Sequence, residues 1–205
     1  MSALGYTQII DYLTRANDEE RLVITPLLDA PSQLNPNQAA VDIRLGRVFS
    51  LVRPWTHGVA ELLHSTVAPA QPGLDAVVLD FGTPFIIHPH QFVLARTLEM
   101  VRLPRQLLAY VIGRSSWGRR GLIVATAVVV HPGFAGPITL ELRNLGEMPI
   151  ALYAMDRIAQ LTFHEIDRQT GEATPSQFTA TFEPSLGRVR DASTLERLRR
   201  MSQRS

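Results

Sequence analysis

Residues 113–144, GRSSWGRRGLIVATAVVVHPGFAGPITLELRN, decide the expected fold of this chain. The apolar run 123–130 leads into the turn sequence His131-Pro132-Gly133, and the alternating segment 138–143 follows it. Alternation of apolar and polar residues is typical of a half-buried strand, and Pro and Gly between two such runs indicate a change of direction. The stretch therefore predicts two strands connected through a turn.

Short apolar runs bounded by Gly, Pro or polar residues continue on both sides of this stretch. They predict strands at residues 21–25, 40–50, 77–80, 85–87, 92–98, 107–112, 150–152 and 158–165. Many short strands at close spacing favour a sandwich or barrel over an alternation of strands and helices. We therefore expect a mainly all-β fold.

The strand expected at residues 40–50 has a clear period of two. Val41, Ile43 and Leu45 point to one face, whereas Asp42 and Arg44 point to the other. This pattern predicts a half-buried strand. The two charged side chains are expected to form ion pairs on the strand face or between subunits, and not to act in catalysis.

Other segments lack this pattern. Residues 7–16 predict a short N-terminal helix, which Thr7 can cap. Residues 31–37 are rich in Pro and Asn and predict a loop. Residues 54–76 hold several Pro and Gly with little periodicity, so an irregular excursion is expected there.

The C-terminal part changes character. Residues 171–187 are polar and rich in Thr and Pro, which is typical of a flexible arm. Residues 193–204 begin with a capping box and carry several Arg, and they predict a short basic helix. We expect one domain over residues 1–187, including the N-terminal helix and the arm from about residue 171, and then a basic tail over 188–205.

The composition narrows the function classes. The chain has 205 residues, 45% of them hydrophobic, and a net charge of +1, which suits one well-filled domain without the basic excess of a nucleic-acid-binding protein. No apolar run approaches the roughly 20 residues of a membrane-spanning helix, and no secretory leader pattern is visible. We expect a cytoplasmic protein that has neither a membrane nor a nucleic acid as partner.

Two absent residue types limit the chemistry further. With no Cys, thiol nucleophiles, disulfides and Cys-ligated zinc are excluded. All 20 basic residues are Arg, so a Schiff base on Lys is excluded as well. Carboxylates, His, hydroxyl groups and Arg remain as candidates for catalysis.

Two parts of the opening stretch combine into a candidate site. Arg114, Ser115 and Ser116 offer a guanidinium group and two hydroxyls, a combination that suits phosphate. Glu141 lies on the apolar strand that ends the stretch, where partial desolvation raises the pKa of a carboxyl group toward neutrality. An anion-binding turn and a half-buried carboxylate predict a site for one small, charged substrate.

Three motifs in the chain then carry a family resemblance: Gly-Arg-Ser-Ser, Pro-Gly-Phe-x-Gly and Leu-Glu-x-x-Asn, which occur in this order at matching spacing. With them the chain resembles the bacterial dCTP deaminases, a branch of the trimeric dUTPase-like superfamily. The resemblance covers most of the length. It implies a distorted β jelly roll or β-barrel of dUTPase-like type and a homotrimer with active sites between subunits.

The resemblance also implies an activity, the metal-independent hydrolysis of dCTP to dUTP and ammonia. Glu141 would shuttle protons, and Ser115 would position the attacking water. Mg2+ would reach the site on the nucleotide triphosphate. Without Cys, the zinc signature of other deaminases cannot form. The implied substrate-binding residues are Arg114, Ser116, Arg119, Thr126, Ala127, His131, Phe134, Thr139, Leu140, Phe182 and Ser185.

Departures from the family pattern keep other functions open. His131 stands where the superfamily usually has Asp, so cleavage of dUTP to release diphosphate is less expected. The arm has Thr181-Phe182 and Ser185 in place of the usual Lys-Tyr pair and Gln. The alternatives are a dUTPase-like pyrophosphatase, a bifunctional enzyme, and a member with another substrate or with nucleotide binding alone. We expect the His-x-His of residues 88–90 to form a structural turn and not a metal site.

Overall fold

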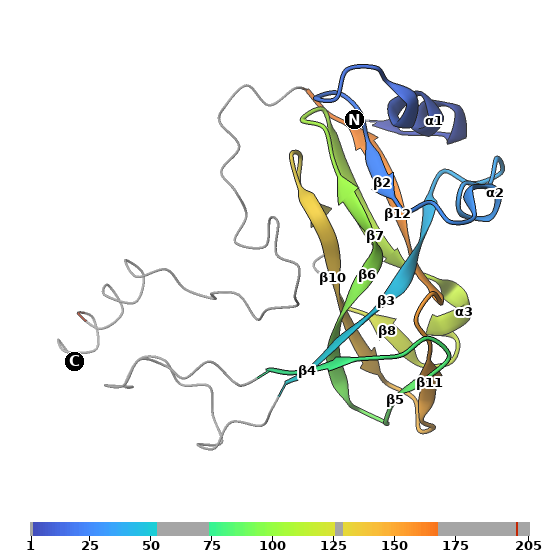
Figure 1. Cartoon of the computed structure of the whole chain (residues 1–205), viewed down its shortest axis with the longest axis vertical. Helices are drawn as coiled ribbons and strands as arrows, with labels where there is room; N and C mark the ends of the chain where they lie inside the picture. Colours follow the sequence, from blue (N-terminus) through green and yellow to red (C-terminus); the bar gives the residue numbers. More distant parts are fainter. Residues whose placement is uncertain (1, 53–73, 126–128, 168–199, 201–205) are drawn as a thin grey trace.

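The computed structural model describes residues 2–52, 74–125, 129–167 and 200, and Figure 1 draws the rest as a grey trace. As predicted, the described chain is mainly β. Its elements are β1 (Ser2–Ala3), α1 (Tyr6–Thr14), β2 (Val23–Thr25), α2 (Ala30–Gln33), β3 (Val41–Val52), β4 (Leu74–Val78), β5 (Phe85–Ile87), β6 (Phe92–Arg102), β7 (Leu107–Gly113), α3 (Ser115–Gly118), β8 (Leu122–Val124), β9 (Val129–Val130), β10 (Ala135–Asn144), β11 (Ile150–Leu152) and β12 (Arg157–Glu165).

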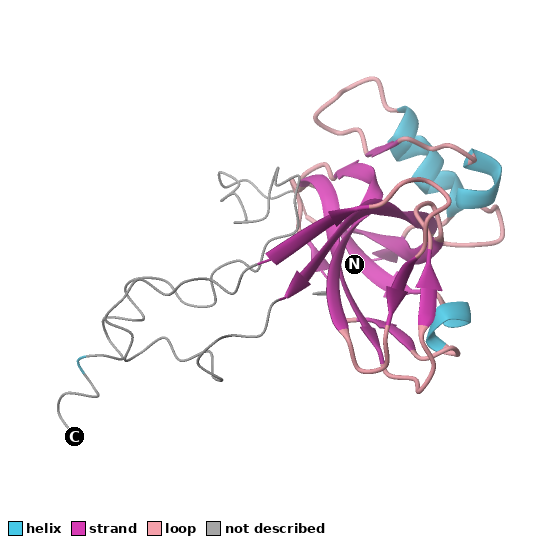
Figure 2. Cartoon of the chain, turned by 60° about the horizontal axis from the view of Figure 1, so that its bottom comes forward, coloured by secondary structure: helices cyan, strands magenta, loops and turns pink. Residues whose placement is uncertain are grey.

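One curled sheet dominates the described part of the chain (Figure 2). Its strands run in the order β8-β10-β6-β3-β12-β7-β9, with β1 on β12, β2 on β6 and β4 on β3; β11 and β5 form a separate pair. Each pair is antiparallel. The curl encloses a core of side chains from β3, β10 and β12, such as Ile43, Leu140 and Phe163, which are fully buried.

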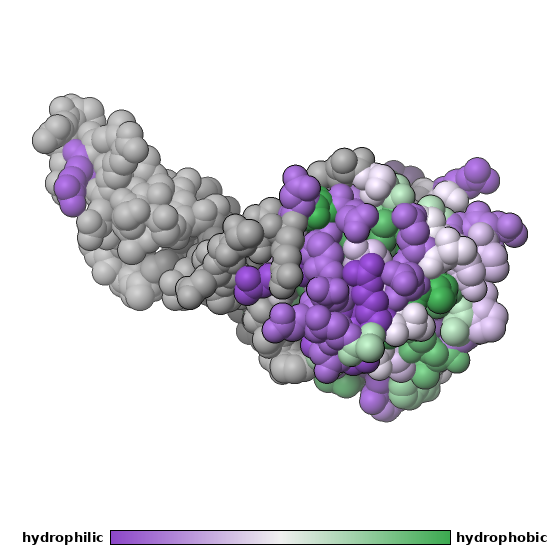
Figure 3. All heavy atoms as spheres, turned by 90° about the horizontal axis from the view of Figure 1, so that it is seen from above, coloured by the Kyte–Doolittle hydropathy of each residue, from purple (hydrophilic) through white to green (hydrophobic). Residues whose placement is uncertain are grey.

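The helices lie outside the sheet. Figure 3 looks onto the end that carries α1, where hydrophilic side chains cover most of the visible surface. α1 packs on this end because Ile9 and Tyr12 are buried, and the Tyr12 hydroxyl donates to the Glu165 carboxylate at 2.7 Å. No helix in the described ranges is long and apolar enough to cross a membrane.

The structure corrects the expectation for β3. Its core face is as predicted, but its other face is not exposed, since Asp42 is 1% and Arg44 is 6% exposed. β3 lies in the middle of the sheet between β6 and β12. Arg44 pairs with the buried Glu99 at 3.7 Å and donates to the side chain of Gln33. Ion pairs and hydrogen bonds of this kind are what allow charged groups to be buried.

Several predicted boundaries also change. The loop expected at residues 31–37 begins as a short helix, α2, in which Pro31 occupies the first turn, where proline is tolerated. The run 123–130 is not one strand, because β8 pairs with β10 whereas β9 pairs with β7. β4 begins at Leu74, inside the expected excursion. The remainder of that excursion, the arm 171–187 and all but Arg200 of the basic tail lie outside the described residues.

Candidate functional site

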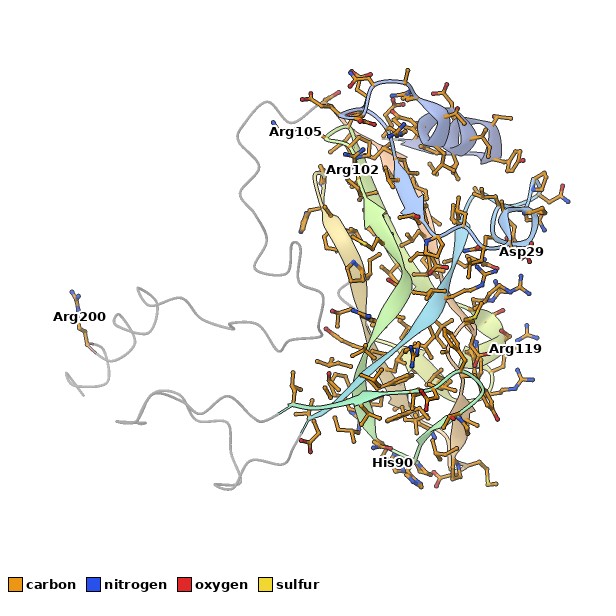
Figure 4. All side chains as sticks on the ribbon, viewed as in Figure 1. Asp29, His90, Arg102, Arg105, Arg119 and Arg200 are labelled. Carbon is orange, nitrogen blue, oxygen red and sulfur yellow. The ribbon has the colours of Figure 1, made fainter. Side chains whose placement is uncertain are left out.

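The Arg-Ser bend, residues 114–119, begins where β7 ends. Arg114 is in an extended conformation and caps α3, and the amides of Trp117 and Gly118 donate to its carbonyl at 3.0 and 3.1 Å. The Trp117 indole donates to the carbonyl of Arg157 at 2.9 Å, which ties the bend to β12. Ser115 and Ser116 are left exposed, as is Arg119, which projects from the outer side of the sheet (Figure 4).

The exit from the bend requires glycine. Gly121 has φ +91°, and a Cβ there would lie 2.7 Å from the amide nitrogen of Gly146. Its carbonyl accepts the amide of Leu145 at 2.8 Å. This close approach fixes the bend against the end of β10, and β8 then runs beside that strand.

Arg114 is part of an internal ion pair. Its guanidinium donates to the carboxylate of Asp42, which also accepts from Gln160 at 2.7 Å and from Arg157 at 3.4 Å. The Asp42 side chain is 2% exposed, whereas that of Arg114 is 24% exposed. An arginine has five N–H donors, so the group can hold Asp42 and still donate to a phosphate. The expectation that Asp42 forms an ion pair is confirmed.

Glu141 lies on β10 between β6 and β8. Its cross-strand neighbour is the buried Leu94, and its own side chain is half-buried. Burial raises the pKa of the Glu141 carboxyl group above its ordinary value of 4.5. The desolvation that the sequence pattern predicted is therefore confirmed. A carboxyl group with a raised pKa binds a proton more readily than an exposed one, which suits a residue that transfers protons.

The two residues before Glu141 point to opposite faces. Thr139 is half-buried and shares the face of Glu141, whereas Leu140 is fully buried in the core. The Leu140 side chain faces inward, so the predicted contact of Leu140 with the substrate stays a prediction for its peptide group. A register shift between Pro137 and Thr139 precedes them, and the Thr97 hydroxyl accepts the amide of Ile138 there at 2.9 Å.

The turn 131–134 lies at the far end of β10. The amide of Phe134 donates to the carbonyl of His131 at 3.1 Å, and Gly133, with φ +77°, donates to Leu103 at 3.1 Å. His131 is exposed, and Phe134 is half-buried against the core. Within one chain the Phe134 ring therefore packs against the core, and its predicted contact with the substrate stays a prediction.

Register along β10 separates the predicted groups. Ala125, directly after β8, donates to the carbonyl of Glu141 at 2.7 Å, whereas Leu122, at the start of β8, pairs with Asn144. At ~3.3 Å per strand residue, the bend end of β8 lies about 10 Å along the strand from Glu141. By the same rise the turn before Ala135 lies about 20 Å away in the other direction.

Figure 4 shows these two ends of the sheet. Arg102, which pairs with Ala135, lies at one end, and His90, whose amide donates to the carbonyl of Asn144 at 2.7 Å, lies at the other. The described part of one chain thus holds these groups at three separate places. The bend precedes β8, Glu141 lies within β10, and the turn 131–134 precedes β10. Four predicted site residues lie outside the described residues: Thr126, Ala127, Phe182 and Ser185.

His88 and His90 form the structural turn that was expected. The amide of Gln91 donates to the carbonyl of His88 at 3.1 Å, and His90 has a φ of +62°. Within the described ranges, no three His, Asp or Glu side chains are grouped so that they could hold a metal ion.

Sequence reasoning missed the other partners of Asp42. Arg157 and Gln160 lie on β12, far along the chain, and only the register of β12 on β3 brings them to Asp42. The one available signal was an Asp between Val41 and Ile43 at the start of a long strand, a position that needs a partner when buried.

Three comparisons relate this chain to known proteins. Residues 9–166 match a family described as dCTP deaminase-like. A protein of Dictyoglomus thermophilum named dCTP deaminase, dUMP-forming, is 43% identical over 150 residues, which are 73% of this chain and 75% of that protein. A Halobacterium salinarum protein of the same name is 39% identical over 193 residues, 88% of this chain and 92% of that one. A Natronomonas pharaonis dCTP deaminase is 39% identical over 183 residues, 86% and 91% of the two chains.

The fold has a counterpart among solved structures. The 2'-deoxycytidine 5'-triphosphate deaminase of Agrobacterium tumefaciens superposes with a TM-score of 0.57 at 23% identity. The match covers 78% of this chain and 47% of that structure, so this chain spans about half of its length. At this identity the likeness supports the fold alone, and the expected mainly β fold is confirmed.

Proposed function

Since the chain belongs to the dCTP deaminase-like family, we propose that it hydrolyses the amino group of dCTP and releases ammonia. The observation that carries the proposal is Glu141, a half-buried carboxyl group with a raised pKa on the strand that follows the Pro-Gly-Phe-x-Gly turn. Deamination needs one group that accepts a proton from water and later gives it to the leaving nitrogen.

The proposed reaction uses Glu141 for both transfers. The carboxylate takes a proton from water as the oxygen bonds to C4 of cytosine, and the protonated carboxyl group then donates to the amino nitrogen. The C4–N bond breaks and ammonia leaves. The second proton of the water then moves from the C4 hydroxyl to ring N3, so that C4 keeps the oxygen as a carbonyl and the ring becomes uracil. Ser115 positions the water through its hydroxyl group. The step needs no metal held by the protein.

The phosphates are assigned to the bend. Arg114, Ser116 and Arg119 offer charge-assisted and hydroxyl hydrogen bonds to phosphate oxygens. Mg2+ enters bound to the triphosphate, since this ion is commonly held through substrate phosphates and few protein ligands. His131 contacts the sugar, and Thr139 and the peptide of Leu140 line the site beside Glu141.

We further propose that the active enzyme is a homotrimer whose sites lie between subunits. The supporting observation is that one chain spreads the bend, Glu141 and the turn 131–134 along β8 and β10. A neighbouring copy can supply the bend or the turn to the Glu141 of the first. Symmetric association of this kind gives identical sites, one at each interface.

The proposed product is dUTP, because an imidazole at position 131 is a poor replacement for the carboxylate that orients water in dUTP cleavage. A second candidate is a bifunctional enzyme that continues to dUMP and diphosphate. It is favoured by the relatives named dUMP-forming, one of which is 43% identical.

A single assay with two readouts distinguishes these functions. The protein is incubated with dCTP, dCMP, CTP or dUTP plus Mg2+, and ammonia and diphosphate are measured separately. We expect ammonia from dCTP without diphosphate. Diphosphate from both dCTP and dUTP establishes the bifunctional enzyme, and diphosphate from dUTP alone establishes a pyrophosphatase. Binding of dCTP without either product establishes a nucleotide-binding protein.

Substitution of Glu141 tests the assigned role. Glu141→Gln keeps the size of the side chain but cannot accept the proton, so kcat for ammonia release should fall at least about a hundredfold while dCTP still binds. Glu147→Gln is the matched control, because Glu147 is exposed in the turn after β10. Turnover by Glu141→Gln at the rate of this control would reject the assignment.

A further inference from the structure

We propose that Asp42 is a positioning residue that holds the Arg114 guanidinium in place for the substrate phosphates, and so sets the preference for a triphosphate over a monophosphate. The inference rests on the proposed function and adds a residue from outside the bend. Asp42 lies on β3, and within the described chain it is the carboxylate that joins β3, β12 and the start of α3.

Arg114 is held both at its backbone and at its guanidinium group. Its amide donates to the carbonyl of Ile158 at 3.2 Å, and its guanidinium donates to the Asp42 carboxylate. Arg114 directly precedes the exposed Ser115 and Ser116. A guanidinium with one edge fixed presents its remaining donors in one orientation, because the group is planar and rigid.

Asp42 itself has little freedom. Its carbonyl accepts the amide of the Gln33 side chain at 3.1 Å, and the same amide donates to Glu99 at 3.0 Å. Glu99 in turn accepts the amide of Arg44 at 2.8 Å. Gln33 and Glu99 are completely buried. The backbone of Asp42 is therefore fixed to the interior of the sheet, whereas Gln160 and the two arginines contact its carboxylate.

The charges around Asp42 favour an anion. The Asp42 carboxylate is shared by two guanidinium groups, those of Arg114 and Arg157, and Arg157 also interacts with the exposed carboxylate of Asp29. The Asp42 side chain is 2% exposed, but those of the two arginines are 24% and 44% exposed, so the guanidinium groups and not the carboxylate face the solvent side. The exposed Arg119 adds a third guanidinium group. Phosphate groups of a nucleotide have the charge and the acceptors that this arrangement requires.

The test compares nucleotides that differ in phosphate number. Asp42→Asn keeps the shape and one acceptor for Gln160 but removes the charge that orients Arg114. For this variant we expect kcat/KM for dCTP to fall about tenfold, mainly through KM, as expected for a lost charged hydrogen bond. The value for dCMP should change little, so the dCTP to dCMP ratio should fall by the same factor.

Glu99→Gln is the matched control, since it neutralises another buried carboxylate of the same network that makes no contact with the bend. Its dCTP to dCMP ratio should stay within about twofold of the wild type even where its urea midpoint drops as much as that of Asp42→Asn. An equal loss for both nucleotides in Asp42→Asn would overturn the inference and reduce Asp42 to a stabilising role.

A double-mutant cycle with Arg114→Gln tests whether Asp42 acts through Arg114. If Asp42 acts through Arg114, Asp42→Asn should add nothing to kcat/KM in the Arg114→Gln background, whereas multiplied losses would overturn the inference. Arg114→Gln alone is the second variant in case Asp42→Asn does not fold. It removes the guanidinium group that Asp42 holds, so the ratio should fall, and an unchanged ratio would also overturn the inference. Wild-type protein without ammonia release would instead refute the proposed function.

Discussion

Among single side chains, Glu141 has the environment that matters most for the proposed chemistry. Burial raises the pKa of its carboxyl group above 4.5, which means that the folded state holds the proton more tightly than the unfolded state. Its contribution to stability is therefore fully present below the unfolded pKa and is lost as pH rises through the folded pKa.

The direction of this pKa shift gives a prediction that does not depend on catalysis. The free energy of unfolding of the wild type should fall relative to that of Glu141→Gln as pH is raised from 4 toward neutrality, because Gln has no proton to lose. Urea unfolding of the two proteins across this range measures the difference. A wild type that gains stability relative to the variant would show that the carboxylate is stabilised in the folded protein.

His131 gives a second prediction for a single residue. His131→Asp restores the carboxylate that the superfamily usually carries at this position, and the site is exposed, so folding should be unaffected. Diphosphate release from dUTP should increase on the order of a hundredfold if the new group orients water. His131→Asn, which lacks the charge, is the control. Equal rates for the two variants would show that position 131 does not decide the product.

Among the strands, β10 contains a register shift just before Thr139. The shift determines which face of the sheet Thr139 and Glu141 share. The Thr97 hydroxyl accepts the buried amide of Ile138 at this shift. Thr97→Val should lower the free energy of unfolding by about 1–3 kcal/mol, because it leaves that amide without an acceptor. Thr97→Ser, which keeps the hydroxyl, should recover most of the loss. Urea unfolding measures both, and equal stabilities would contradict this account of the shift.

The contact between α1 and β12 has a pH signature. Burial, and then the hydrogen bond to Glu165, raise the pKa of Tyr12 to about 12. The stability from this contact should be present below pH 10 and should be lost as pH rises through about 12. The wild type should therefore approach Tyr12→Phe in unfolding free energy over this range. A constant difference between the two proteins would contradict the assignment.

How well an element could be predicted depended on its pattern. The period of two in residues 138–143 predicted β10, and the structure extends it to Ala135–Asn144. The largely apolar run 123–130 has no clear period, so nothing local indicated that β8 and β9 join different strands. α2 is one turn long, too short for a helical period. The partners of Asp42 could not be foreseen, because Arg114 and Arg157 come from distant parts of the chain.

For the site, the functional residues were easier to predict than their positions relative to one another. Short motifs identified the Arg-Ser bend and Glu141, and the predicted desolvation of Glu141 is confirmed. Their separation along β8 and β10 follows from strand register, which no local motif encodes.

For the whole molecule, the separation of these groups makes association part of the proposed mechanism. A trimer with sites between copies should show the mass of three chains in solution by light scattering, at concentrations where it is active. An active monomer would contradict the proposed assembly, because all groups of the site would then have to meet within one chain.

The most direct test of the account mixes two inactive variants. If Glu141 from one copy and Ser115 from another act on the same nucleotide, Glu141→Gln and Ser115→Ala chains refolded together should form some intact sites. Random mixing in equal amounts should restore about a quarter of wild-type ammonia release from dCTP, since each intact site needs the right chain on both sides. Activity no higher than that of either variant alone would contradict the claim that Glu141 and the bend of a neighbouring copy form one active site.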